Sequence, residues 1–425
     1  MRRFFFLMVL LSAASMMARA GFVATGGRTG QPYVRVPEAS TGLSQVFLFN
    51  GIEGGELRFE CADPSSCKWS QYVSHAAQSI PLSATVSGTA SVLETIEAGR
   101  GYIVESGGMQ YACFVLDYES LPLSYTALDP QTDAEDICES LQLSVKGTMD
   151  DFVYYTPDGK KCTLERVHTL TYDDVGWNAT DGVYEEKTRT MEAEGYVSAF
   201  VIDAPLCDTE FRLKGDQFAQ WFGLPAQEIS AAFKALRVET HARAVTDDEK
   251  DEVSGLTLQG QAPMTVTFSA EASPAVSFLT WRLYVDPDDA DYYLYRTEEE
   301  VEYTFEASGT FKVKLQVSNE VCSDSAEFTV TITESSLDCP NFFSPRSTPG
   351  ENDEFRVAYQ SLVKFHGRIM NRWGVTLFEW DDPDKGWDGT FNGKPVNPGV
   401  YFYIITATGS DGMEYLKRGD INLLE

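Results

Sequence analysis

The residues of this sequence best able to do chemistry are its cysteines, and their spacing favours disulfides over a metal site. There are eight of them: Cys61, Cys67, Cys113, Cys138, Cys162, Cys207, Cys322 and Cys339. The tightest pair, Cys61 and Cys67, is too widely spaced for the C-x-x-C pattern of zinc sites, and only His75 lies near it. An even count predicts structural disulfides in an oxidising compartment, with about a hundred pairings open. Cys322 and Cys339 are expected at opposite ends of one strand and are left unpaired, because a bridge needs Cα atoms within about 7 Å.

No combination of residues points to a catalytic site. The patterns G-x-S-x-G, H-E-x-x-H, Walker A and strand-linked G-x-G-x-x-G are absent from the sequence. A glycosidase needs two carboxylates across a cleft, and 64 acidic residues give no reason to choose a pair. The four histidines are scattered outside any nucleophile motif and are expected to be structural or at the surface: His75, His168, His241 and His366. The sequence therefore predicts no catalytic residue and no enzyme.

Two other groups of residues could bind a ligand. The acidic run at 286–291 supplies the oxygens that Ca²⁺ prefers, but the EF-hand pattern is missing. A solvated loop is favoured, so calcium stays a weak alternative and no cofactor or metal site is assigned. The second group is a candidate platform of tyrosines beside acidic residues: Tyr154, Tyr155, Tyr292 and Tyr293. These rings could stack on a surface glycan or dock a protein, unless half of each run faces a sandwich core.

Charge and the first residues of the chain restrict where the protein acts. The net charge of −31 repels phosphate backbones and anionic lipid surfaces, which excludes nucleic-acid binding. Arg2 and Arg3 precede a short apolar stretch and Ala18-Arg19-Ala20 has the form of a cleavage site, so residues 1–20 are predicted to be a signal peptide. No later window is apolar for long enough to span a membrane. The sequence thus predicts an exported protein without a transmembrane segment of its own.

The elements that must position these residues are mainly strands. Apolar residues recur with a period of two in short runs bounded by Gly, Asp, Asn and Pro, which is typical of an all-β chain. Ser106-Gly107-Gly108 predicts a hairpin turn, and only Gln217–Gly223 and Gln227–Leu236 look helical. Residues 21–130 and 131–245 are each about the size of one immunoglobulin-like sandwich, and Trp69 is expected in a core.

The segment 246–336 begins with a charged linker and continues with sharply alternating strands. Phe278–Val285 forms a predicted strand around Trp281, which we expect to be buried. The run from Tyr303 through Gly309 to Asn319 resembles the end of a PKD-type immunoglobulin-like domain. The loop after the tryptophan is the acidic run at 286–291, which departs from that family, so no loop-borne feature is carried over.

The last segment, 337–425, holds several separate motifs in order. Their residues are Asn341, Phe342, Ser344, Pro345, Asn352, Asp353, Asn371, Arg372, Trp373, Gly374, Trp387, Asp388, Gly389, Gly399, Tyr401 and Gly419. The series strongly resembles the type B C-terminal sorting domain of the type IX secretion system, also called the gliding motility-associated C-terminal domain. Two departures are the loop at 346–351 in place of Asn-Gly-Asp-Gly, which puts a cation site there in doubt, and Met370 in place of an aromatic residue. The pattern of turns and alternation predicts a small β-sandwich by itself, but it does not predict export.

The resemblance implies an exported protein that the type IX translocon recognises by its tail. It also implies retention at the surface by an outer-membrane β-barrel of the PorP/SprF-like family, with the turns at 371–374 and 387–389 as candidate contacts. The sequence predicts a cell-surface or extracellular protein with a non-enzymatic binding role, such as an adhesin, that displays its tandem sandwiches. A structural accessory of the secretion or gliding machinery is the alternative, and a secreted hydrolase is a weaker one.

Overall fold

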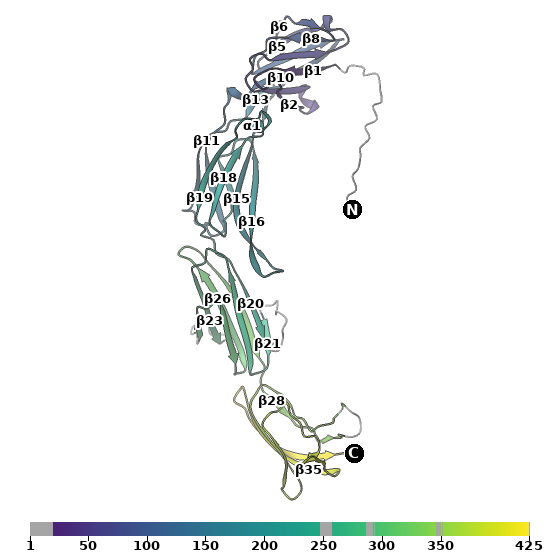
Figure 1. Ribbon diagram of the computed structural model, residues 1–425, viewed down its shortest axis with the longest axis vertical. Helices are drawn as coiled ribbons and strands as arrows, with labels where there is room; N and C mark the ends of the chain where they lie inside the picture. The colour runs from purple at the N-terminus through teal and green to yellow at the C-terminus, as the bar shows by residue number, and fades with distance from the viewer. Residues whose placement is uncertain are drawn as a thin grey trace.

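The computed structural model describes residues 20–246, 257–285, 292, 294–345, 350 and 352–424. Residues 1–19 of the predicted signal peptide, most of the charged linker, the acidic run at 286–291 and Tyr293 lie outside the described residues. The described chain consists mainly of strands, and four units follow one another in an extended row (Figure 1). The prediction of an all-β chain of tandem sandwiches is therefore confirmed. None of the described helices is long and apolar enough to cross a membrane.

The first unit is a sandwich of a four-stranded sheet, β1-β4-β8-β7, and a six-stranded sheet, β2-β3-β10-β9-β5-β6. Its strands are β1 (Gly21–Thr25), β2 (Tyr33–Arg35), β3 (Gln45–Phe49), β4 (Glu56–Glu60), β5 (Lys68–Tyr72), β6 (Ile80–Leu82), β7 (Thr85–Ser87), β8 (Ala90–Leu93), β9 (Arg100–Ser106) and β10 (Met109–Asp117). Four 3-10 turns lie at Ala39–Thr41, Pro64–Ser66, Ala76–Gln78 and Tyr118–Ser120. Phe59, Trp69 and Cys113 are buried between the sheets. The predicted hairpin at 106–108 is confirmed, since β9 and β10 pair as antiparallel neighbours.

The second unit has a three-stranded sheet, β11-β12-β17, and a four-stranded sheet, β16-β15-β18-β19. Its elements are β11 (Ser124–Gln131), β12 (Ser140–Thr148), β13 (Phe152–Tyr155), β14 (Lys161–Leu164), β15 (Val167–Asn178), β16 (Val183–Glu194), β17 (Ala199–Asp203), β18 (Thr209–Gly215), α1 (Gln217–Trp221) and β19 (Gln227–Phe233). The helix predicted at 217–223 is present as α1, whereas the one predicted at 227–236 is wrong. Residues Gln227–Phe233 of that segment pair with β18 instead, because packing Phe233 and, in part, Ile229 into the core beside the sheet outweighs the helix propensity of its Gln, Glu and Ala residues.

The second unit also covers the outer face of the six-stranded sheet of the first. The β13–β14 hairpin and α1 pack on that face, so Leu48 and Phe114 are buried although they point away from the first sandwich core. At the centre Arg166, which is completely buried, forms an ion pair with Asp216 and donates from Nε to the carbonyl of Asp150 over 2.9 Å. The first two units are therefore joined by a continuous core with one buried ion pair.

The third unit is a sandwich of β20-β22-β25 against β21-β27-β26-β23-β24. Its strands are β20 (Thr240–Thr246), β21 (Thr257–Gly260), β22 (Met264–Ala272), β23 (Phe278–Val285), β24 (Leu294–Arg296), β25 (Glu300–Phe305), β26 (Gly309–Ser318) and β27 (Ser323–Ile332). Trp281 is buried in its core against Phe268, as expected for a strand tryptophan.

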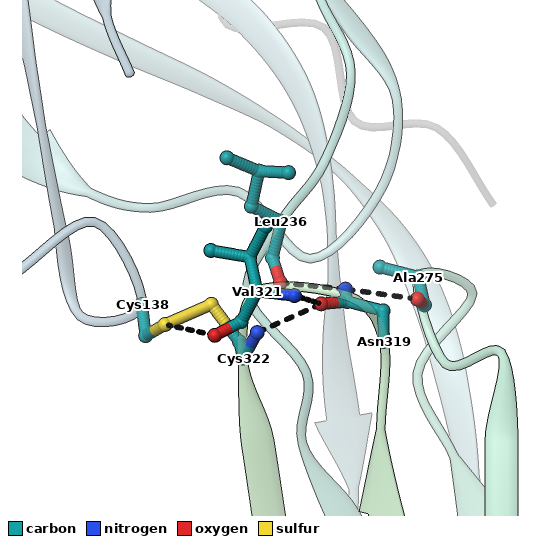
Figure 2. Close-up of a disulfide and its surroundings, with 6 residues drawn as sticks. All are labelled: Cys138, Leu236, Ala275, Asn319, Val321 and Cys322. Carbon is teal, nitrogen blue, oxygen red and sulfur yellow. Dashed lines mark hydrogen bonds between the residues drawn. A yellow bond between two sulfur atoms is a disulfide. The ribbon is translucent and has the colours of Figure 1, made fainter. Parts of the chain in front are cut away.

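A disulfide joins the second unit to the third. Cys138, from the loop between β11 and β12, is bonded to Cys322 with Cα atoms 5.7 Å apart. Beside the bridge, Asn319 Nδ2 donates to the carbonyls of Leu236 (2.8 Å) and Ala275 (3.2 Å), as Figure 2 shows. Cys322 and Cys339 are unpaired with one another as expected, but the prediction that they lie at opposite ends of one strand is wrong, because β27 ends at Ile332. The partner of Cys322 lies 184 residues away in the sequence.

The fourth unit is built on a five-stranded sheet, β29-β36-β35-β31-β32, with two small two-stranded sheets. Its strands are β28 (Ser336–Asp338), β29 (Phe342–Phe343), β30 (Ala358–Gln360), β31 (Leu362–Met370), β32 (Thr376–Trp380), β33 (Thr390–Phe391), β34 (Lys394–Pro395), β35 (Gly399–Gly409) and β36 (Glu414–Leu423). One face of the large sheet carries the core, which includes Phe343, Trp387 and Ile405.

Two predicted domain boundaries fall inside strands. The boundary at 130/131 lies within β11, which pairs with β12 of the second unit. The boundary at 245/246 lies within β20, which pairs with β22 of the third unit. Because a strand belongs to the sheet that satisfies its backbone groups, the second unit begins at β11 and the third at β20.

Candidate recognition surface of the C-terminal unit

The turn between β31 and β32 is organised by Asn371 and exposes an aromatic ring. Asn371 Oδ1 accepts from the backbone N–H groups of Trp373 and Val375, each over 3.0 Å, and Gly374 has a φ of +78°. The Trp373 side chain is 78% exposed, and the guanidinium of Arg372 lies 5.2 Å from its ring centroid. Of the two predicted contact turns, this one presents side chains to solvent.

The second predicted contact turn has a structural role. Trp387 is completely buried, donates from its indole N–H to the carbonyl of Thr390 over 2.8 Å, and packs on the ring of Tyr401. Asp388 Oδ1 accepts from the backbone N–H of Thr390 over 2.9 Å. Gly389 has a φ of +75°, and a Cβ there would come within 2.9 Å of Leu423. This turn therefore closes the core and offers no indole to a partner.

Four of the remaining motif residues make hydrogen bonds near the ends of β29 and β35. Asn341 accepts through its carbonyl from the backbone N–H of Asn422 over 2.9 Å, and the backbone N–H of Ser344 donates to the carbonyl of Asn352 over 2.8 Å. Tyr401 donates from its hydroxyl to the carbonyl of Asn397 over 2.7 Å. The other motif residues in these segments are Phe342, Pro345, Asp353, Gly399 and Gly419. Among them Phe342 is 46% exposed, next to the buried Phe343.

The outer face of the large sheet carries an apolar stripe that the sequence interpretation missed. Along β35 the side chains of Val400, Phe402 and Ile404 point away from the core and are 46%, 42% and 36% exposed. We call these three residues the β35 stripe. Met370 on β31 lies opposite Phe402 in the register. The signal was present in the sequence, because β35 is apolar at every position from 400 to 405, whereas a strand with one solvated face alternates with polar residues.

Charged residues border the β35 stripe. In the register of the sheet, Ile404 lies between Arg368 on β31 and Arg418 on β36, and Phe402 lies opposite Asp420 on β36. Arg368 also forms an exposed ion pair with Glu379 over 3.2 Å. An apolar centre inside a polar border is the composition of a protein-binding surface.

The predicted tyrosine platform is divided by the fold. Tyr154 is only 7% exposed and belongs with Tyr155 to the core between the first and second units. The carbonyl of Tyr155 accepts from the Tyr72 hydroxyl over 2.9 Å. The Tyr154 ring is therefore not available to stack on a ligand and Tyr155 is partly covered, because the β13–β14 hairpin packs against the first sheet. Only long-range packing decides this, so local sequence could not reveal it.

The other half of the platform is at the surface of the third unit. Tyr292 is 50% exposed, and its ring lies 6.0 Å from that of Tyr295 and 6.3 Å from that of Tyr284. The guanidinium of Arg282 lies 5.6 Å from the Tyr292 centroid. We call these three tyrosines with Arg282 the aromatic edge.

The described surface has several grooves of similar volume, between about 500 and 640 Å³. One of them, of about 600 Å³, lies where the second and third units meet, and it is lined by Leu236, Phe278 and Val321, with Cys207 and Asn319 among its other lining residues. In the part of the chain that the structure describes, no three His, Cys, Asp or Glu side chains come together as metal ligands would.

Three segments match known protein families. Residues 337–423 match the CHU_C Type IX secretion signal domain, residues 255–332 match the PKD domain, and residues 130–231 match the Fibronectin type III domain. These matches confirm that the fourth unit resembles the type IX sorting domain and the third unit the PKD domain. They also show that the second unit is similar to a fibronectin type III domain. All three families are non-catalytic types, and the match of the tail indicates export by type IX secretion.

The solved structures that resemble this chain include multidomain proteins of low sequence identity. The dimeric latent PorU of Porphyromonas gingivalis is 11% identical with a TM-score of 0.16, and the alignment covers 74% of this chain but only 35% of that one. Sidekick-1 immunoglobulin domains 1–5 are 11% identical with a TM-score of 0.26, covering 92% and 98%. The FN1–FN3 domains of chicken CNTN1 are 10% identical with a TM-score of 0.22, covering 72% and 98%. At these TM-scores none of them bears on the function of this chain. No curated protein matches it.

Proposed function

We propose that this chain, whose residues 337–423 are a type IX secretion signal domain, is a non-enzymatic binding protein of the outer cell surface. The fourth unit is the export signal, and the three preceding units are the passenger that it carries to the surface. The observation that carries this proposal is the family match of the tail, on a unit whose sheet leaves an apolar stripe exposed.

The β35 stripe is the part of the tail best suited to dock a partner. The type IX translocon reads it during export, and a PorP/SprF-like outer-membrane β-barrel holds it afterwards. Burying Val400, Phe402 and Ile404 supplies the binding energy, while the charges of Arg368, Arg418 and Asp420 fix the orientation. The exposed Trp373 adds an aromatic anchor at the end of the same sheet.

The passenger has the form of an adhesin. Its units are joined end to end and extend away from the tail, so the first unit lies farthest from the fourth (Figure 1). The aromatic edge of the third unit supplies rings and a guanidinium that suit a glycan or an acidic protein surface. The alternatives are a structural accessory of the secretion or gliding machinery, whose ligand would be another envelope protein, and a secreted hydrolase. No described feature favours the hydrolase.

Protease shaving of intact cells tests whether the fourth unit is the export signal. Cells with a type IX system produce either the full chain or a chain that stops at Leu337. We expect protease added outside to digest the full chain, while the shortened chain is protected in the periplasm. Equal protection or equal digestion of both chains would contradict the proposal.

A variant of the β35 stripe tests the docking surface. Phe402→Glu with Ile404→Glu places charges on the exposed face, so we expect the full chain to be retained in the periplasm. The matched control is Val201→Glu, which changes an equally apolar strand residue that is 65% exposed on the passenger. Circular dichroism of the purified proteins checks that both variants fold. If the double variant reaches the surface as efficiently as the control, the stripe is not the docking surface, although the fourth unit can still be the export signal.

A further inference from the structure

Cys61 and Cys67 lie at the two ends of a loop that crosses between the sheets of the first unit. Cys61 follows β4 in the four-stranded sheet, and Cys67 precedes β5 in the six-stranded sheet. Their Sγ atoms are 3.1 Å apart, which is closer than two non-bonded sulfur atoms normally approach. The thiols therefore already face each other in the folded protein.

The backbone holds both cysteines in this position. The N–H of Cys61 donates to the carbonyl of Thr89 over 3.3 Å, and the N–H of Cys67 donates to the carbonyl of Pro64 over 3.4 Å. Asp63 closes the intervening 3-10 turn by accepting from the backbone N–H of Ser65 over 3.2 Å. Little rearrangement is needed to bring the two sulfur atoms to bonding distance.

We infer that Cys61 and Cys67 form a second disulfide after export, which cross-links the two sheets of the first unit. Each thiol loses one proton and one electron, and a sulfur–sulfur bond forms. The two electrons reduce the disulfide of a thiol oxidoreductase in the oxidising compartment, through a mixed disulfide with the more accessible Cys67. The inference rests on export from the cytoplasm, not on a binding role of the passenger.

An enzyme is the appropriate oxidant because the thiolate is scarce. Burial and the neighbouring Cys61 thiol raise the pKa of Cys67 to about 11. Thiolate is the attacking species in disulfide exchange, so uncatalysed oxidation of the folded pair is slow. The other four cysteines lie on different elements of the fold and serve as internal references for free thiols: Cys113, Cys162, Cys207 and Cys339.

Alkylation and mass spectrometry test the inference on the full exported chain. The protein is incubated with oxidised glutathione and a thiol oxidoreductase, denatured in the presence of iodoacetamide and digested with trypsin, which releases residues 59–68 as one peptide containing both cysteines. We expect this peptide to be unlabelled and about 2 Da lighter than the dithiol form, since two hydrogen atoms are lost. Peptides with the four reference cysteines should be labelled.

Two further measurements make the result decisive. In the variant Cys61→Ser we expect Cys67 to carry a label or glutathione, which shows that the peptide is reachable by the reagents. The Cys138–Cys322 cross-link in the same digest shows that the sample is oxidised. A peptide 59–68 with two labels in a sample that contains this cross-link would overturn the inference.

Discussion

The junction between the first and second units and the junction between the second and third are stabilised by different chemistry. The first is a shared hydrophobic core around the buried pair of Arg166 and Asp216. The second is held by the Cys138–Cys322 disulfide and the hydrogen bonds of Asn319. The first junction therefore depends on apolar burial around one ion pair, and the second on a covalent bond with hydrogen bonds beside it.

The difference matters for a protein that folds after it leaves the cytoplasm. Apolar burial and an ion pair form as soon as the two units meet, whereas the disulfide also requires an oxidant. We expect the first junction to be complete in any compartment and the second to be complete only after export. Four variants or conditions test this comparison, from the largest expected effect to the smallest.

Removing the buried guanidinium should have the largest effect. Arg166→Ala leaves the Asp216 carboxylate buried without its partner, which costs about 3–5 kcal/mol of the free energy of unfolding. Denaturant unfolding of the passenger measures this loss of stability. Arg212→Ala is the matched control, because Arg212 pairs with Glu210 at the surface, and no measurable change is expected there. Equal stability of the two variants would mean that the apolar core alone holds this junction.

Removing the disulfide should have the next largest effect. The double variant Cys138→Ser and Cys322→Ser frees a loop of 184 residues in the unfolded chain, so we expect a loss of about 2–4 kcal/mol. Reductant should destabilise the parent protein more than the double variant, in which only the inferred Cys61–Cys67 bridge can be reduced. A parent protein that is no more sensitive to reductant than the double variant would show that Asn319 and its neighbours hold the second junction without the bridge.

Strand periodicity and turn chemistry predicted local features of the fold, but not the contacts between units. The hairpin at 106–108 and the buried Trp281 follow from residues close in sequence. The pairing of Cys138 with Cys322 and the burial of Tyr154 depend on how one unit packs against the next, which local patterns do not encode. The segment 227–233 became a strand for the same reason, since β18 offered it a full set of backbone partners.

The candidate surface shows the same limit. The sequence singled out the motif residues Asn371 and Gly389 as candidate contacts, and the structure shows that both shape turns. In the sequence the β35 stripe was visible only as the uninterrupted apolar run 400–405, and whether its outer face is covered is decided by the rest of the unit. Sequence motifs thus located the unit, whereas its uncovered apolar face is seen only in the structure.

Acid should weaken the first junction before it affects the second. Burial lowers the pKa of His168 below its ordinary value of 6.5; the nearby charges are Asp216, Arg166 and Asp151. Below pH 6.5, His168 is protonated in the unfolded chain but stays neutral in the folded chain. The free energy of unfolding should therefore fall as the pH decreases from 6.5 toward the lower pKa of the folded state.

Thermal unfolding between pH 7 and pH 5 measures this dependence. The slope should flatten in His168→Gln, in which the buried titrating group is absent. The double variant without the disulfide should keep the slope of the parent protein, because Cys138 and Cys322 belong to the other junction. An unchanged slope in His168→Gln would assign the acid sensitivity to other groups.

The smallest effect should come from the ring stack at the second junction. Trp177 on β15 lies parallel to His241 on β20, with ring centroids 4.0 Å apart, and an aromatic pair of this kind contributes about 0.5–1.5 kcal/mol. With the disulfide intact, Trp177→Ala should leave the distance distribution between spin labels on the two units nearly unchanged. Without the disulfide, the same substitution should broaden it. If the broadening is equal in both backgrounds, the bridge does not restrain the orientation of the units, and the junction depends on its non-covalent contacts just as the first one does.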